Sequence, residues 1–165
     1  TNLTLVGSPG GDGPGVALRA GTAGTFANGI VQGAQGGAVD VVDQGGHIAG
    51  LVADGSLRVL GFTAFASGAS GFPDESQPAD DDDEGFDEAR AFATGADAVS
   101  LGPDPQLAQP YRLSAAGLRP ALTLPGVPVP SGRIFEASAR FRGAFEGRAG
   151  GSRDWTAGWT AFPAD

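Results

Sequence analysis

The chain has 165 residues, which is long enough for one domain with a hydrophobic core and too short to require two. Its net charge of −9, with arginine as the only strongly basic residue type, predicts an acidic surface that repels phosphate backbones and argues against nucleic-acid binding. Cysteine is absent, which excludes disulfides, zinc–thiolate sites and cysteine nucleophiles.

Glycine and proline are unusually frequent, at 29 and 12 residues. No Gly-X-Y period accompanies them, so collagen is excluded, and many tight corners in an all-β fold explain the excess. Methionine is absent, from which we expect a processed or trimmed product whose true start lies upstream. No signal peptide or membrane-spanning apolar run is recognisable.

A short apolar phrase recurs in the first third of the chain. It reads Leu-Val-Gly at residues 5–7, Ile-Val-Gln-Gly at 30–33 and Leu-Val-Ala-Asp-Gly at 51–55. A second set lies between these, at 16–21 and 38–43. Each phrase is typical of a short strand closed by a glycine corner. Spacings of about 25 and about 21 residues favour the coils of a parallel β-solenoid. Asn28, inside one such coil, is expected to cap backbone groups at a bend.

The pattern changes after residue 56. Residues 57–72 predict another strand pair, with Phe62, Phe65 and Phe72 filling the core or covering one face. An acidic run follows and is expected to form an exposed loop. Residues 85–98 then predict a helix, because acidic residues at its start suit the helix dipole and Gly95 would end it. The proline-punctuated residues 99–130 predict extended wrapping segments.

Two stretches resemble a family of uncharacterised bacterial secreted or surface proteins. Residues 17–31, Ala-Leu-Arg-Ala-Gly-Thr-Ala-Gly-Thr-Phe-Ala-Asn-Gly-Ile-Val, resemble that family's "LRxGTxGxxxNxIV" stretch. Gly-Ala-Phe at 143–145 and Asp-Trp-Thr-Ala-Gly-Trp-Thr-Ala-Phe at 154–162 resemble its "GAF…DWTxGWTxF" terminus. The resemblance implies a right-handed parallel β-helix and a secreted or lipid-anchored location, and it carries no known activity.

The acidic run is the candidate metal site. It consists of Asp80, Asp81, Asp82, Asp83 and Glu84. Hard cations such as Ca²⁺ take several carboxylate oxygens, and Asp87 and Glu88 could add ligands if the loop folds back. The run lacks the spaced ligands of an EF-hand, and consecutive carboxylates repel one another. A solvated loop is therefore the preferred interpretation, with Ca²⁺ binding as the alternative.

A second candidate set concerns polysaccharide chemistry and consists of Asp40, Asp43, Asp54, Arg19 and Arg58. Glycosidases place two carboxylates across a cleft, and β-helix lyases combine carboxylates that hold Ca²⁺ with a basic residue. Surface charges beside turns are the simpler interpretation, because two strand residues three apart point to opposite faces. His47, the only histidine, is expected at an exposed corner, and no Gly-x-Ser-x-Gly motif supports a catalytic triad.

Trp155 and Trp159 could form a sugar-binding platform with Arg140 and Arg142 beside them. Capping of an open solenoid end, which would otherwise expose unpaired strand edges, is the preferred interpretation. If the platform interpretation holds, these four residues are the candidate partner or glycan contact.

The sequence therefore predicts an all-β fold: a short right-handed parallel β-helix with one helix-bearing acidic insertion and a C-terminal aromatic cap. Residues 1–125 would form the core, with the insertion near 73–98, and residues 126–165 a wrapping and capping segment. The predicted function is a non-catalytic structural or accessory module of a larger extracellular, periplasmic or cell-surface assembly, with a protein partner or self-association. The alternative is a polysaccharide-binding or polysaccharide-cleaving protein, Ca²⁺-dependent in one form.

Overall fold

The structure is a computed structural model of the whole chain. It describes residues 1–19, 21–43, 45–76, 81–95, 98–107, 110, 115–129 and 139–148. Asp80, Trp155 and Trp159, which carry part of the predicted metal and glycan sites, lie outside the described residues.

Parallel strands dominate the described part of the chain and are divided among three small sheets. The largest sheet has the order β1-β4-β7-β8, and the smaller ones pair β2 with β5 and β3 with β6. The strands are β1 (Thr4–Val6), β2 (Val16–Arg19), β3 (Gly24–Ala27), β4 (Ile30–Gln32), β5 (Val39–Val42), β6 (Leu57–Leu60), β7 (Thr63–Phe65) and β8 (Ser100–Leu101). Every pairing between these strands is parallel.

The strand register follows some of the recurring phrases. Leu5 of the first phrase pairs with Val31 of the second. The second set also pairs, since Val16 lies opposite Val39. The third phrase, at 51–55, does not continue the sheet. The strand beside β4 is β7 instead, where Thr63 lies opposite Ile30.

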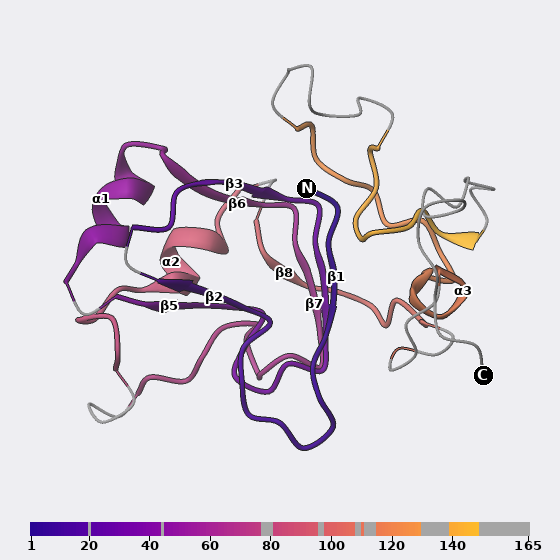
Figure 1. Cartoon of the computed structure of the whole chain (residues 1–165), viewed down its shortest axis with the longest axis horizontal. Coiled ribbons are helices and arrows are strands. Elements are labelled where there is room, and N and C mark those ends of the chain that lie inside the picture. The colour runs from indigo at the N-terminus through magenta and orange to yellow at the C-terminus, as the bar shows by residue number, and fades with distance from the viewer. Residues whose placement is uncertain are drawn as a thin grey trace.

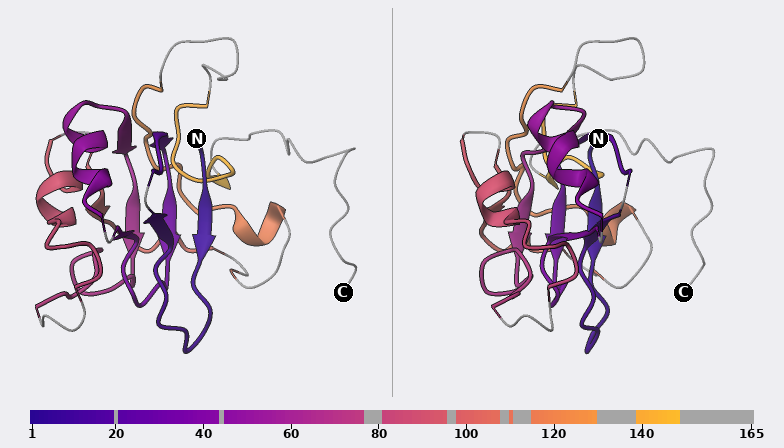
Figure 2. Two further views of the ribbon diagram at one scale, coloured as in Figure 1. Left: turned by 60° about the vertical axis from the view of Figure 1, so that its left-hand side comes forward. Right: turned by 90° about the vertical axis from the view of Figure 1, so that its left-hand side faces the viewer.

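In the described part of the chain, three helices accompany the sheets: α1 (His47–Ala53), α2 (Glu88–Phe92) and α3 (Ala115–Leu118). Residues 51–53, most of the third phrase, lie in helix α1. Ile48, Leu51 and Val52 stand at helical spacing, and Ile48 is buried in the core while the other two pack against it. Figures 1 and 2 show α1 and α2 together on one side of the sheets, with α3 on the opposite side.

The prediction of an all-β, right-handed parallel β-helix is wrong. The described residues form a small mixed structure, with parallel strands in several small sheets and helices interleaved between them. The physical reason lies in the third phrase, whose apolar residues satisfy a helical period as well as a strand. The predicted helix at 85–98 is present in shortened form as α2, with Asp87 as its N-cap.

A continuous apolar core lies between the sheets and the two helices. It includes Leu18, Val31, Val39, Val41, Ile48, Leu57, Phe62, Phe72 and Phe92. Phe62 is completely buried, and its ring lies where a β-carbon on Gly29 would have to sit. A side chain at position 29 is therefore incompatible with this packing. Phe62 and Phe72 are buried in the core and Phe65 is partly buried, which agrees with the prediction that these rings fill the core or cover one face.

Residues 120–129 and 139–148 attach to the strand region by side-chain hydrogen bonds. The Asn28 amide exchanges two bonds with the backbone of Val127. The Arg142 guanidinium donates to the Thr63 hydroxyl at 2.6 Å and to the Phe62 carbonyl at 3.1 Å. The proposed division into a core of 1–125 and a capping segment of 126–165 stays a prediction.

Candidate metal centre

The segment 81–88 folds back against β5. The Asp43 amide donates to the Asp82 carbonyl at 3.2 Å, and the Val41 amide donates to Glu88 Oε1 at 3.2 Å. Because both contacts use the same edge of β5, the acidic residues of this segment are brought beside Asp40, which projects from that strand. The folding-back considered for Asp87 and Glu88 does occur, and Glu88 is the residue that reaches the cluster.

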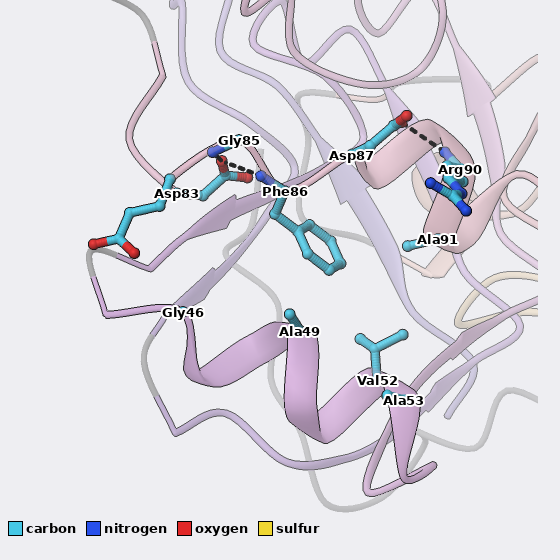
Figure 3. A pocket seen from close by; sticks show the side chains of 11 residues that line it. Gly46, Ala49, Val52, Ala53, Asp83, Gly85, Phe86, Asp87, Arg90 and Ala91 are labelled. Atoms are coloured by element: carbon cyan, nitrogen blue, oxygen red, sulfur yellow. Dashed lines mark hydrogen bonds between the residues drawn. The ribbon is translucent and has the colours of Figure 1, made fainter.

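The tight turn inside this segment is built by two carboxylates. Asp81 Oδ1 accepts from the amides of Asp83 and Gly85 at 3.3 and 3.0 Å. Asp83 Oδ1 accepts from the amides of Gly85 and Phe86 at 3.0 and 2.9 Å (Figure 3). One oxygen of Asp83 is thus committed to the backbone, which fixes where the other oxygen points.

Five carboxylates form two groups that a metal ion could join. One ligand oxygen each from Asp40, Glu75 and Asp82 lies within 4.8 Å of the others, and the same holds for Glu75, Asp81 and Asp83. Two oxygens bound to one Ca²⁺ at about 2.3–2.6 Å stand at most about 5 Å apart, so both groups fit that ion. The acidic side chains of the described residues could therefore bind a metal.

Two oxygens of this cluster have no hydrogen-bond donor. Asp82 Oδ1 and Asp83 Oδ2 are buried and lack a partner among the described residues. Asp83 itself is only 2% exposed. A buried carboxylate oxygen without a donor or a positive charge is costly, and a bound cation removes that cost.

Burial and mutual repulsion raise the pKa values of several of these groups. Burial, followed by the charges of Asp82 and Asp83, raises the pKa of Asp40 to about 6, while Arg19 opposes the rise. Burial, followed by the charges of Asp83 and Asp40, raises the pKa of Glu75 to about 7. These pKa values are raised first by burial and then by repulsion between the carboxylates, and Arg19 offsets part of the rise at Asp40.

Glu88 and Asp83 are both buried, and their carboxyl groups interact. Burial raises the pKa of Glu88 to about 8, and the charges of Glu75 and Asp83 add to the effect. Burial likewise raises the pKa of Asp83. Protonated Glu88 lies beside Asp83 and offsets part of the cost of its buried oxygen in the metal-free protein, and a bound cation would take over that role. The pKa of exposed Asp81 is lowered instead, because the Gly85 and Asp83 amides bind its carboxylate.

The expectation of an exposed acidic loop holds for Asp81 and Glu84 and fails for Asp83, which is buried. Glu84 is exposed and lies outside both groups. Glu75 was missed altogether, and Asp40 was considered only for polysaccharide chemistry. A high local density of acidic residues from 74 onward was the one available signal, because the contact with β5 is tertiary.

The residues proposed for polysaccharide chemistry are not gathered into one cleft. The Asp43 carboxylate is buried, accepts from the Ile48 amide and lies 3.4 Å from His47 Nδ1. Asp54, beyond the end of α1, accepts from the Ser56 amide at 2.8 Å. Asp40 instead belongs to the acidic cluster, where Arg19 is near enough to influence it. His47 is 66% exposed, as predicted for a corner residue.

The predicted partner contacts can be located only in part. Arg142 is committed to the backbone and hydroxyl groups of the strand region, including the Pro125 carbonyl at 3.0 Å. Burial lowers the pKa of its guanidinium. The Arg140 carbonyl accepts from the Gly126 amide at 3.1 Å. The glycan or partner role of Trp155, Trp159, Arg140 and Arg142 stays a prediction.

A pocket of about 590 Å³ lies between α1 and α2, next to the acidic cluster (Figure 3). Its apolar wall comes from Ala49 and Val52 of α1 and from Phe86. Asp83 belongs to both this pocket and the acidic cluster. The turn at 83–86 therefore forms the boundary between the two.

Comparisons with known proteins identify no relative. No protein-family model matches the chain, and neither a curated protein nor a solved structure does. The family and location implied by the resemblance at the two ends therefore stay predictions. In the described part of the chain, none of the helices combines the length and apolar character needed to cross a bilayer.

Proposed function

We propose that the protein is a non-catalytic, calcium-binding module of a larger extracellular or cell-surface assembly. The observation that carries the calcium proposal is Asp83, a carboxylate that is 2% exposed, has one oxygen without a donor, and faces Glu75 and Asp81. A divalent cation supplies the positive charge that this arrangement lacks.

The donor set favours calcium. Both groups consist of carboxylates alone, the hard oxygen ligands that Ca²⁺, Mg²⁺ and Mn²⁺ prefer over softer donors. Ca²⁺ accepts six to eight oxygens in irregular geometry, whereas Mg²⁺ demands a near-ideal octahedron and retains water. Carboxylates drawn from a strand, a loop and a tight turn suit the more tolerant ion.

The position of the cluster supports a structural role for the ion. Its carboxylates come from β5 through Asp40, from the loop through Glu75, and from the 81–83 turn. An ion held between these segments would fasten the turn to the strand. Such weak structural calcium sites are typical of extracellular modules, where calcium is abundant. This supports the proposed location.

An exposed residue at the edge of the largest sheet supports the proposal that the protein binds a partner. β8 is the last strand in the order β1-β4-β7-β8, so its outer edge has no neighbour among the described strands. Leu101 on β8 is 57% exposed. β8 has only two residues, which is too short an edge for strand addition, so the partner contact proposed here is made by the exposed Leu101 side chain.

Calcium binding is tested on protein stripped with a chelator, by calorimetric titration and thermal unfolding. At free Ca²⁺ about 100 times Kd, binding should add about 2.7 kcal/mol to the free energy of unfolding. For a chain of this size that raises Tm by about 5–10 °C. The Asp83→Asn variant keeps the Oδ1 acceptor, so it should fold without calcium and lose most of the calcium response.

Asp74→Asn is the matched control. Asp74 is exposed and its carboxylate accepts from the Ser76 amide at 3.2 Å, a bond that asparagine preserves. This variant removes the same charge one residue from Glu75 and should bind calcium as the parent does. A parent protein whose Tm is unchanged by millimolar Ca²⁺ would refute the proposal.

The assembly proposal is tested by the native mass of the protein in sedimentation velocity. We expect a dimer or a complex with a co-purifying chain, and Leu101→Lys should dissociate it. A monomer with unchanged sedimentation in both proteins would contradict a role for this edge. Binding or turnover of a polysaccharide by that monomer would instead support the alternative class.

A further inference from the structure

The acidic cluster divides into two overlapping sites, and Glu75 belongs to both. The first group contains Asp40 and Asp82 with Glu75, and the second contains Asp81 and Asp83 with Glu75. All oxygens within one group lie within 4.8 Å of one another, but the five residues do not form a single group of that size. One central ion would therefore leave part of the cluster uncoordinated.

Each group has its own buried oxygen without a donor. Asp82 belongs to the first group and Asp83 to the second, and each has one buried oxygen without a partner among the described residues, Asp82 Oδ1 and Asp83 Oδ2. Asp83 Oδ1 is held by the Gly85 and Phe86 amides, so the free oxygen is the one available to an ion. Burying an oxygen without a partner costs free energy, and this cost is present in both groups.

We propose that the cluster binds two calcium ions side by side, bridged by the carboxylate of Glu75. This inference rests on the proposed calcium-binding function and goes beyond it in number and arrangement. Asp40 and Asp82 complete the first position, and Asp81 and Asp83 complete the second. A carboxylate has two oxygens and can hold one ion with each, which is the chemistry a bridging ligand needs.

Charge compensation supports two ions over one. Two calcium ions supply four positive charges against the five carboxylates, whereas one ion supplies two. Among the described residues, Arg19 acts on Asp40, and one such charge does not balance five carboxylates. A second cation relieves repulsion that a single ion would leave in place.

Stoichiometry is the decisive measurement. Chelator-stripped protein is titrated with Ca²⁺ in a calorimeter, and bound calcium is counted independently by native mass spectrometry. We expect two ions per chain, the second binding more weakly because it approaches an occupied neighbour. Glu75→Gln should weaken both steps by about tenfold or more, since ligand charge sets calcium affinity.

Variants of the unshared ligands distinguish the two positions. Asp40→Asn or Asp82→Asn should remove one step, and Asp81→Asn or Asp83→Asn should remove the other, each leaving one ion bound. Asp74→Asn should retain two. Thermal unfolding in chelator shows which variants are folded, and two variants for each position guard against a folding defect.

The possible outcomes distinguish the two-ion arrangement from the calcium-binding function on which it rests. One ion per chain, lost equally in every ligand variant, would overturn the bridged pair and leave the calcium-binding function standing. No calcium bound by the parent protein would overturn both. Two ions that persist in Glu75→Gln with unchanged affinities would overturn the bridge.

Discussion

The side chain of Asn28 and the backbone of Val127 hold each other through a pair of reciprocal hydrogen bonds. Asn28 Nδ2 donates to the Val127 carbonyl at 3.0 Å, and the Val127 amide donates to Asn28 Oδ1 at 2.7 Å. Asn28 is completely buried and has a φ of 61°. The sequence-based expectation that Asn28 caps backbone groups at a bend is confirmed. The groups it caps belong to a segment far away in the chain.

Two substitutions at Asn28 separate its hydrogen bonds from its backbone conformation. Asn28→Gly keeps the left-handed φ and loses both bonds, which should cost about 2–4 kcal/mol because buried backbone groups of Val127 lose their partners. Asn28→Ala should cost about 1 kcal/mol more, because a β-carbon disfavours positive φ. Denaturant unfolding measures both. Equal stability of the parent and Asn28→Gly would show that the pair does not stabilise the fold.

Gly29→Ala should destabilise the protein by about 1–3 kcal/mol, because the new methyl group would meet the buried Phe62 ring. Gly50→Ala is the matched control. No atom lies within 4 Å of a β-carbon built on Gly50, which stands inside α1. Alanine there should stabilise by up to about 1 kcal/mol through helix propensity. Thermal unfolding of both variants should show shifts of opposite sign.

Asp43→Ala should loosen the start of α1. The buried Asp43 carboxylate accepts from the Ile48 amide, which otherwise lacks a partner in the first helical turn. Its loss should cost about 1–2 kcal/mol, as for other helix-capping side chains. Amide hydrogen exchange should show faster exchange in α1 than in β4 of the same variant. Uniform exchange across both elements would contradict a local capping role.

A comparison of α1 with the strands shows which elements of the fold could be predicted from the sequence. The phrases at Leu5 and Ile30 were correctly interpreted as strands, and they pair with each other. The phrase at Leu51 is similarly apolar, but Ile48, Leu51 and Val52 share a helical face. In addition, the Asp43 carboxylate accepts a hydrogen bond from the Ile48 amide at the start of the helix. Local composition did not separate the two cases, because both periods fit so short a run.

The candidate metal centre could also be predicted only in part, because tertiary contacts bring its residues together. Asp81, Asp82 and Asp83 are adjacent in the chain and were recognised as possible ligands. Asp40 and Glu75 join them only because segment 81–88 bonds to β5. No spacing rule relates a strand carboxylate to a loop carboxylate far along the chain. The sequence therefore indicated the candidate chemistry and three of the five candidate ligands.

The raised pKa values of the cluster predict that the metal-free protein is most stable in mild acid. Asp40, Glu75 and Glu88 have pKa values of about 6, about 7 and about 8 in the folded chain. Unfolded carboxyl groups titrate near pH 4. The folded state therefore binds more protons between about pH 4 and pH 8, and its stability must fall as the pH rises through that window.

Thermal unfolding in chelator should accordingly show a Tm several degrees lower at pH 8 than at pH 5. Glu88→Gln should flatten this slope, because a neutral amide keeps an acceptor for the Val41 amide and offers a donor to Asp83. Calcium should reverse the trend, since binding requires ionised carboxylates and so gains strength with pH. A metal-free Tm that rises from pH 5 to pH 8 would mean that the buried carboxylates are not the protonated groups of this fold.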